Sequence, residues 1–182
     1  MTEISGKTNA PKQTETPNKA EMPPKAESGM ISEKETEEQV VLMASRLALM
    51  YHHIGQVLTE ELGLEKAKEL LKEAIWRYGA ESGEKVRAGV EAMGLPLTAE
   101  NYNKVPDLPR YGWVSEQAED GPRVSHCPLA AVWLEKGSTE LGRIYCFVDQ
   151  AKFEAYGNLE CVHLKNLNDG DDCCLFSIKP RD

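Results

Sequence analysis

The chain has 182 residues, and its 21 Lys and Arg against 30 Asp and Glu give a formal net charge of -9 with neutral histidines. This charge argues against a nucleic-acid-binding protein, because neutralising phosphates requires a clustered basic face. Hydrophobic residues make up 41% of the chain without a long apolar run, which predicts one sizeable core and no membrane span. The first residues lack the apolar stretch of a secretory signal, so a cytoplasmic location is expected.

Residues 1–35 differ from the rest of the chain in composition. They hold four of the ten prolines, five lysines and six glutamates, and few apolar side chains. Such a segment cannot bury enough apolar surface to offset the entropy lost on ordering. The sequence therefore predicts a disordered tail over residues 1–35 and a single folded domain over residues 36–182.

Two long helices are predicted to open the domain. From Glu37 to Leu62, apolar residues recur at spacings of three and four, which is typical of a helix with one buried stripe. A second helix is expected from Leu64 to about Met93. Only Gly63 separates the two, so they should form an antiparallel helical hairpin.

Two β-hairpins are predicted in the second half of the chain. Strand-like residues 110–117 and 123–126 flank an Asp-Gly turn, which is a strong hairpin signal. Residues 159–166 and 173–179 form the second pair, around an acidic turn.

Between the hairpins, a short helix beginning at Pro128 and a longer helix over residues 139–155 are expected. The fold class is therefore α+β, with an N-terminal helical hairpin packed with a small antiparallel sheet made of two β-hairpins and two further helices.

All five cysteines follow residue 126. An odd count without an export signal fits reduced thiols better than a disulfide framework. Cys127, between His126 and Pro128, is predicted to cap the short helix, where unpaired backbone amides favour a thiolate. The alternative is a buried cysteine that serves as a small hydrophobic residue.

Cys146 and Asp149 are three residues apart in the predicted helix over residues 139–155, so both project from the same face. A thiol and a carboxylate on one face could be a nucleophile and a base, or two metal ligands. The alternative is a core cysteine beside a carboxylate that caps the helix or faces solvent.

The remaining cysteines lie in the last hairpin. Cys173 and Cys174 are adjacent on a strand and must point to opposite faces. Alternation with Phe176 and Ile178 places Cys174 on the interior face. No pair shows the CxxC spacing of a zinc knuckle.

On the preceding strand, alternation separates two pairs of side chains. Val162 and Leu164 resemble the core-facing pair, so Cys161 and His163 are predicted on the opposite face.

Two further features carry weaker signals. His52 and His53 differ by about 100° around the first helix, and the apolar neighbours Ile54 and Val57 place His53 closer to the buried stripe. The acidic stretch 168–172 lacks the length of a calcium-binding loop and is interpreted as a turn. The chain also lacks a Gly-rich phosphate loop, so the familiar nucleotide-binding motifs give no support.

Taken in order, the short motifs resemble the L-2-amino-thiazoline-4-carboxylic acid hydrolase family over about residues 38 to 180. The resemblance rests on a Cys-Pro before a Trp-bearing helix, a Tyr-Cys followed by Asp on the next helix, and an Asp-Gly-Asp-Asp turn ahead of Cys-x-Phe. The residues concerned are Gly79, Gly83, Gly94–Leu97, Cys127, Pro128, Trp133, Gly142, Tyr145, Cys146, Asp149, Asp169–Asp172, Cys174 and Phe176.

The resemblance implies a small hydrolase that opens a cyclic amidine or isothiourea such as 2-aminothiazoline-4-carboxylate towards carbamoyl-cysteine, acting on a carbon–nitrogen bond. As a chemical hypothesis, Asp149 holds the amidinium while a thiolate of Cys146 or Cys127, or a metal-bound water, attacks. The candidate substrate contacts are His53, His126 and Tyr145. His126 and Cys173 stand outside the family pattern.

Two other functions stay open. The last hairpin also resembles ligand-sensing domains of the vinyl-reductase type, which implies a non-catalytic small-molecule sensor with zinc bound by Cys127, Cys146 and Cys174. The third interpretation is a non-catalytic partner subunit that binds through the tail. A small molecule is the expected ligand, a divalent metal such as zinc is left open as cofactor, and a homodimer is left open as the assembly.

Overall fold

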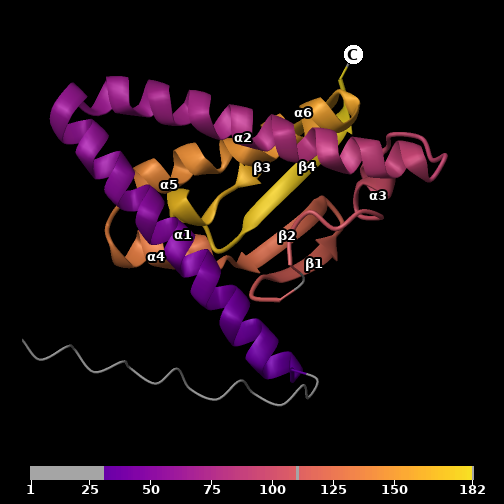
Figure 1. Ribbon diagram of the computed structural model, residues 1–182, viewed down its shortest axis with the longest axis horizontal. Helices are drawn as coiled ribbons and strands as arrows, with labels where there is room; N and C mark the ends of the chain where they lie inside the picture. Colours follow the sequence, from indigo (N-terminus) through magenta and orange to yellow (C-terminus); the bar gives the residue numbers. More distant parts are fainter. Residues whose placement is uncertain (1–30, 110, 182) are drawn as a thin grey trace, which may run out of the picture. The chain divides into compact units, whose positions relative to one another are not determined.

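Two long helices, α1 (Glu33–Leu62) and α2 (Leu64–Ala92), open the part of the chain described by this computed structural model, residues 31–109 and 111–181 (Figure 1). They join at Gly63, whose φ of 81° lies in the region that favours glycine. The two helices contact each other and share one apolar core, so the predicted helical hairpin is confirmed. Neither they nor any other helix in these residues is long and apolar enough to cross a membrane.

Helix α1 begins four residues earlier than the sequence predicts. The N–H of Glu35 donates to Ser32 Oγ at 3.2 Å, and the N–H of Ser32 donates to Glu35 Oε2 at 3.0 Å. This reciprocal capping box fixes the start of the helix within the last residues assigned to the tail. Residues 1–30 of that predicted tail lie outside the described residues.

The elements between the long helices and the last hairpin follow the predicted order with one difference. In place of one helix over residues 139–155 there are two, α5 and α6, and they meet at Cys146. A short helix, α3, precedes the first hairpin. The bounds are α3 (Ala99–Tyr102), β1 (Val114–Ala118), β2 (Gly121–His126), α4 (Pro128–Glu135), α5 (Thr139–Tyr145) and α6 (Phe147–Gly157).

The chain ends in β3 (Leu159–Lys165), the single-turn η1 (Leu167–Asp169) and β4 (Cys174–Pro180). The four strands form one antiparallel sheet in the order β1-β2-β4-β3. Pairing of β2 with β4 joins the two predicted hairpins, and β3 lies at an edge. The α+β fold class with two hairpins is therefore confirmed.

Helix α6 packs between α2 and the sheet, and glycines let α2 approach it closely. A Cβ atom on Gly79 would lie 2.7 Å from the Val148 carbonyl oxygen, and one on Gly83 would overlap the carbonyl oxygen of Lys152. One apolar cluster surrounds the buried Trp133 where α1, α2, α4 and α5 meet. A second cluster lies on the far part of α2, α3, α6 and β3, so α6 is held on two sides.

Candidate functional site

A cavity of about 150 Å³ lies where α4, the α5–α6 junction and strands β3 and β4 come together. Its walls are mostly apolar and aromatic, with a few polar groups on the α6 and β3 side, which is typical of a small-molecule site. A cavity of about this size accepts one small ring. The residues that carry polar or aromatic groups are Tyr78, Trp113, Cys127, Trp133, Tyr145, Cys146, Asp149, Lys152, His163, Asn168, Cys174 and Phe176.

Most of the residues singled out from the sequence line this one cavity. Cys127 comes from the start of α4, Tyr145 and Cys146 from the α5–α6 junction, Asp149 from α6, and Cys174 from β4. Separate segments of the chain therefore bring the five side chains together.

Two predicted substrate contacts do not line the cavity. His53 is exposed and its Nδ1 lies 3.1 Å from Gln56 Oε1, while His52 is buried. The sequence placed His53 nearer the buried stripe, and this is wrong, because α1 packs through the side that carries Tyr51 and leaves Ile54 exposed.

His126, the second predicted substrate contact that does not line the cavity, is exposed at the end of β2. Cys173 also lies outside the cavity; it is buried, and its Sγ is 3.5 Å from Asp172 Oδ1. The two residues that stand outside the family pattern are therefore both absent from the cavity lining.

The faces of β3 are the reverse of the predicted ones. Cys161 and the His163 side chain are buried, whereas Val162 and Leu164 are exposed. Because α6 covers one face of this edge strand, the helix decides which residues are buried. As a result His163, which the sequence analysis left out of the site, faces the cavity.

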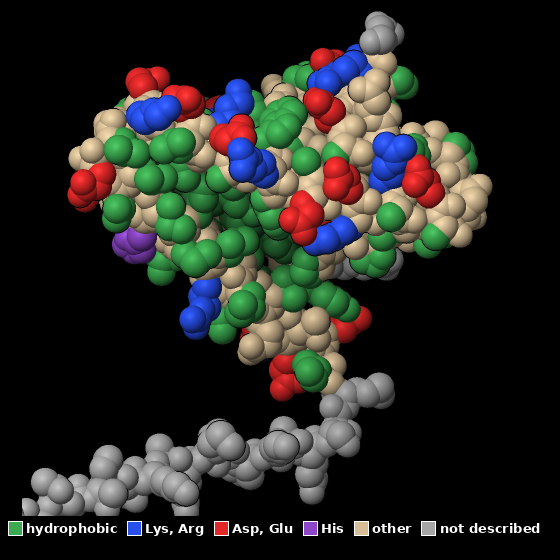
Figure 2. Space-filling view, turned by 45° about the horizontal axis from the view of Figure 1, so that its top comes forward, with side chains coloured by type: hydrophobic (Ala, Val, Ile, Leu, Met, Phe, Trp, Pro, Cys, Tyr) green, Lys and Arg blue, Asp and Glu red, His purple; other side chains and the backbone are tan. Residues whose placement is uncertain are grey.

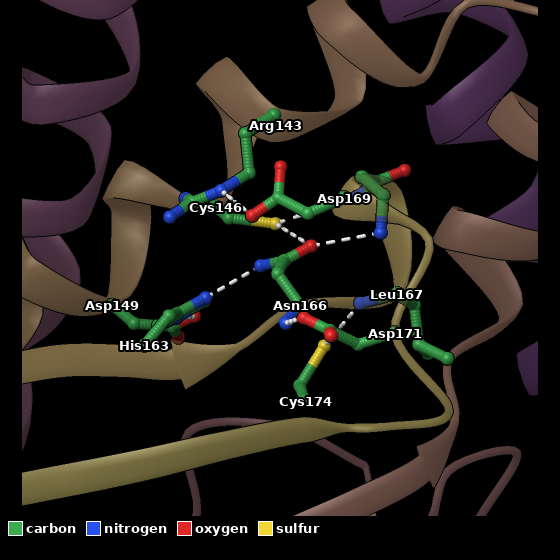
Figure 3. Close-up of polar contacts among 10 residues, drawn as sticks. Arg143, Cys146, Asp149, His163, Asn166, Leu167, Asp169, Asp171 and Cys174 are labelled. Atoms are coloured by element: carbon green, nitrogen blue, oxygen red, sulfur yellow. Dashed lines mark hydrogen bonds and ion pairs between the residues drawn. The ribbon is translucent and has the colours of Figure 1, made fainter.

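A chain of hydrogen bonds orients Asp149 (Figure 3). Asn166 Oδ1 accepts from the N–H of Asn168 at 2.9 Å, which leaves Asn166 Nδ2 as the donor that faces His163 Nδ1 at 2.6 Å. His163 Nδ1 is therefore an acceptor, and the ring proton sits on Nε2, 3.1 Å from Asp149 Oδ2. The network fixes a neutral imidazole that donates to an ionised carboxylate.

The charge of Asp149 is consequently not balanced by its partner. Lys152 also lines the cavity, but its Nζ lies 2.6 Å from Asp107 Oδ2, and Tyr102 donates to the same oxygen at 2.9 Å. Within residues 31–109 and 111–181, Asp149 forms no ion pair with Lys or Arg. The cavity thus holds a carboxylate suited to a cationic group.

The acidic turn holds this network in place. The N–H of Asn166 donates to Asp171 Oδ2 at 2.7 Å, and Arg143 Nε donates to Asp169 Oδ2 at 2.9 Å. Gly170 provides the left-handed residue, with φ of 92°. The prediction of a turn is confirmed, and its carboxylates fasten the segment that carries Asn166 and the end of β3.

Cys146 lines the cavity beside the two asparagines of the network. Asn168 Nδ2 donates to its Sγ at 3.6 Å, and Asn166 Oδ1 lies 3.9 Å from the same atom. Burial raises the pKa of the Cys146 thiol to about 12, and the charge of Asp149 acts in the same direction. At neutral pH the residue is a thiol.

Cys127 occupies the N-cap position of α4, as predicted, but not as a thiolate. The backbone amides of Ala130 and Leu129 and the side chain of Trp113 lower its pKa, yet burial outweighs them and the net pKa is raised. The amides at the helix start favour the thiolate, as the sequence predicts, but desolvation is the larger effect and the net pKa of Cys127 is raised.

The donor set does not fit zinc. Burial raises the pKa of Cys174 to about 11, and it also raises the pKa of the two other cysteines proposed as ligands, Cys127 and Cys146. In the part of the chain that the structure describes, no group of three or more His, Cys, Asp or Glu side chains is arranged to hold a metal ion. No step is therefore assigned to a metal.

Sequence reasoning missed His163, Asn166 and Asn168. One signal was present for His163, since it alternates with Cys161 on a strand next to a predicted site helix. The two asparagines act through a turn whose geometry fixes which amide atom faces the imidazole. That information is not local in the sequence.

Comparison with known protein families adds a match over most of the described domain. A family model described as L-2-amino-thiazoline-4-carboxylic acid hydrolase matches residues 43–178, more than half of the chain. The matched range contains every residue of the hydrogen-bonded chain from Asp149 to Asn168. No curated protein and no solved structure matches the sequence.

Proposed function

The chain belongs to the L-2-amino-thiazoline-4-carboxylic acid hydrolase family, and we propose on this basis that it hydrolyses a small cyclic amidine or isothiourea, with 2-aminothiazoline-4-carboxylate as the first substrate to test. The observation that carries the proposal is an ionised, oriented carboxylate, Asp149, in a small aromatic cavity beside the Cys146 thiol. A protonated amidine is a flat cation, which complements such a cavity.

Asp149 binds the amidinium in this proposal. Its Oδ2 is fixed by His163, so the carboxylate presents a set orientation to the substrate, and a charge-assisted pair is shorter and stronger than a neutral hydrogen bond. The aromatic residues Trp133, Tyr145 and Phe176 provide flat apolar walls for the rest of the ring. Both the charge and the shape of the cavity support a heterocyclic cation.

Cys146 is the proposed nucleophile. Its raised pKa keeps the thiol protonated in the free protein. A bound cation offsets the charge of Asp149, which is one of the groups that raise this pKa, and so favours ionisation only when substrate is present. Cys127, which lines the same cavity, is the alternative thiol.

The proposed reaction proceeds in two steps. Cys146 Sγ adds to the amidine carbon, its proton passes to Asp149, and the ring bond opens as the leaving heteroatom takes that proton. Water then adds to the same carbon, the carbon–sulfur bond to Cys146 breaks, and the thiol regains a proton. Opening at the carbon–nitrogen bond, as the family resemblance implies, frees an amine, whereas opening at the ring carbon–sulfur bond frees a thiol.

Turnover of 2-aminothiazoline-4-carboxylate, followed by proton NMR with a thiol titration of the product, tests the proposal. Asp149→Asn should lower kcat/KM at least about 100-fold, equivalent to about 2.7 kcal/mol of transition-state stabilisation. Glu154→Gln is the matched control, because it neutralises a carboxylate of the same helix that pairs with Arg181 at the surface. Equal losses in both variants would contradict the role given to Asp149.

Replacement of the two thiols separates the nucleophiles. Cys146→Ala should abolish turnover and Cys127→Ala should reduce it less. Activity that survives both replacements would rule out covalent catalysis by either cysteine. Water activated by Asp149 would then be the remaining route.

A non-catalytic binding domain is the second candidate. The observation in its favour is that the cavity thiols Cys127, Cys146 and Cys174 keep their protons, which suits recognition without chemistry. Calorimetric binding of cyclic amidines without any product would support this function over hydrolysis.

A further inference from the structure

Helix α1 has two apolar faces, and only one of them is used within the domain. The inner face carries the small residues Ala44, Ala48 and Gly55 together with Tyr51, and packs on the core. A stripe of large apolar residues on another side of the same helix is exposed. The domain therefore leaves the larger apolar side chains of α1 in solvent.

We call the exposed stripe the α1 seam; it consists of Met43, Leu47, Met50, Ile54 and Val57, whose side chains are between 38% and 64% exposed. Their spacings of four, three, four and three residues are the a and d spacing of a two-helix coiled coil. In Figure 2, apolar side chains follow α1 along the surface towards the start of the helix. This spacing is the one that pairing with another helix requires.

We propose that two copies of this chain pair through the α1 seam, with the two α1 helices antiparallel. If Met50 of one copy packs opposite Ile54 of the other, then Leu47 packs opposite Val57, and the contact is symmetric about residue 52. Four of the five seam residues are therefore matched when the seam is reversed, and Met43 lies opposite the exposed Glu61 of the other copy. A second copy is the occupant that its sequence fits.

Charges beside the seam favour the same arrangement. Arg46 and Glu60 are exposed and fourteen residues apart, which puts them on the same flank of the seam. Antiparallel pairing about residue 52 brings Arg46 of each copy near Glu60 of the other. In a parallel pair Arg46 would instead approach Tyr51, which is buried in its own domain.

The contact has about the area of a small specific interface. Pairing about residue 52 would cover eight large apolar side chains, four from each copy, and with the flanking Arg46 and Glu60 the covered area is on the order of 1,000 Å² in total, at the lower end of specific interfaces. The net charge of -9 opposes association of two copies, so the apolar seam and the two Arg–Glu pairs must supply the attraction.

Sedimentation velocity of the full chain over a concentration series tests the proposal. The wild type should sediment as a dimer, at twice the 20.3 kDa mass of one chain. Met50→Glu with Ile54→Glu should give a monomer with unchanged circular dichroism, because both positions are exposed. Leu42→Glu, on α1 but off the seam, is the matched control and should stay dimeric.

A charge exchange tests the orientation. Arg46→Glu alone and Glu60→Arg alone should each weaken the dimer about tenfold, and the double variant should restore it, because two cross-pairs are lost and then reformed. A monomeric wild type, a dimer that survives the seam variant, or a double variant no tighter than the single ones would overturn the proposal.

Discussion

Two carboxylates, Asp107 beside α6 and Asp149 within it, are held in opposite ways. Asp107 forms an ion pair with Lys152 and accepts a hydrogen bond from the hydroxyl of Tyr102. Both side chains of the ion pair are largely buried. Asp149, one helical turn before Lys152, receives only a neutral imidazole from His163 and lines the cavity. The first charge is cancelled inside the protein, whereas the second is oriented but left uncancelled.

The difference separates a structural ion pair from a binding group. A buried pair holds its elements together, and removing one partner leaves an isolated charge in a low dielectric. An oriented carboxylate with a neutral partner contributes little to the free energy of folding. It is, however, already in position to bind a cationic ligand. Mutation of Lys152 should therefore affect folding first, and mutation of Asp149 should affect ligand binding first.

Breaking the buried pair should give the largest effect. Lys152→Ala leaves Asp107 without its counter-ion and should lower the free energy of unfolding by about 3–5 kcal/mol. Urea denaturation followed by circular dichroism measures this change. Lys152→Met combined with Asp107→Asn removes both charges and should recover most of the loss; a double variant as unstable as Lys152→Ala would argue against charge isolation as the cause.

Asp149→Asn should show the reverse behaviour. The amide keeps the size of the side chain, so we expect the free energy of unfolding to change by less than about 1 kcal/mol. Affinity for a cyclic amidinium should fall about 100-fold, or about 2.7 kcal/mol, because the charge-assisted pair is lost. Isothermal titration with the amidinium and with a neutral cyclic urea of the same shape measures it. An equal loss for both ligands would show that charge is not the feature recognised.

The sequence predicted the secondary structure around these two carboxylates better than it predicted their side-chain partners. The helical hairpin, the turns and the two β-hairpins depend on local signals such as the Gly63 joint and the Asp-Gly turn, and these were predicted, whereas the start of α1 was not. The single helix predicted over residues 139–155 instead breaks at Cys146, whose backbone φ of -63° and ψ of -11° belong to both helix ends. The break orients the first turn of α6, with Asp149, towards β3.

The side-chain partners depended on tertiary packing. Val162 and Leu164 look like a core face, but only the placement of α6 decides which face of an edge strand is covered. Likewise the seam residue Ile54 looks buried by periodicity, while the small residue Ala48 faces the core. Apolar spacing identifies a helix but does not say which of two apolar faces lies inside.

Close packing of α2 on α6 supports both carboxylates, and we expect an intermediate effect from disturbing it. A Cβ on Gly83 would overlap the Lys152 carbonyl, so Gly83→Ala should lower the free energy of unfolding by about 1–3 kcal/mol despite the better helix propensity of alanine. Thermal unfolding monitored by calorimetry measures it. Ala88→Gly, at an exposed position of α2, is the propensity control and should cost about 1 kcal/mol.

The smallest effect concerns the thiols around Asp149. Burial raises the pKa of Cys146 to about 12 and that of Cys174 to about 11 in the folded protein, against about 8.5 for an unfolded cysteine. As pH rises through 8.5, the unfolded chain loses these protons while the folded chain keeps them. The contribution of these thiols to the free energy of unfolding is therefore complete below this pH and declines above it. Between pH 8 and 9 each such thiol should lower the free energy of unfolding by about 0.7 kcal/mol.

Urea denaturation at pH 8 and pH 9 measures this decline, and Cys146→Ala identifies its source. The variant removes one raised thiol, so its free energy of unfolding should fall by about 0.7 kcal/mol less than that of the wild type over the same interval. Iodoacetamide should label Cys146 in the folded protein about 1,000-fold more slowly than in urea at pH 8, because only the thiolate reacts. Asp149→Asn should speed this labelling, since the carboxylate is one cause of the raised pKa of Cys146. An unchanged rate would mean that burial alone keeps the thiol protonated, and that a bound cation could not activate Cys146 by cancelling the charge of Asp149.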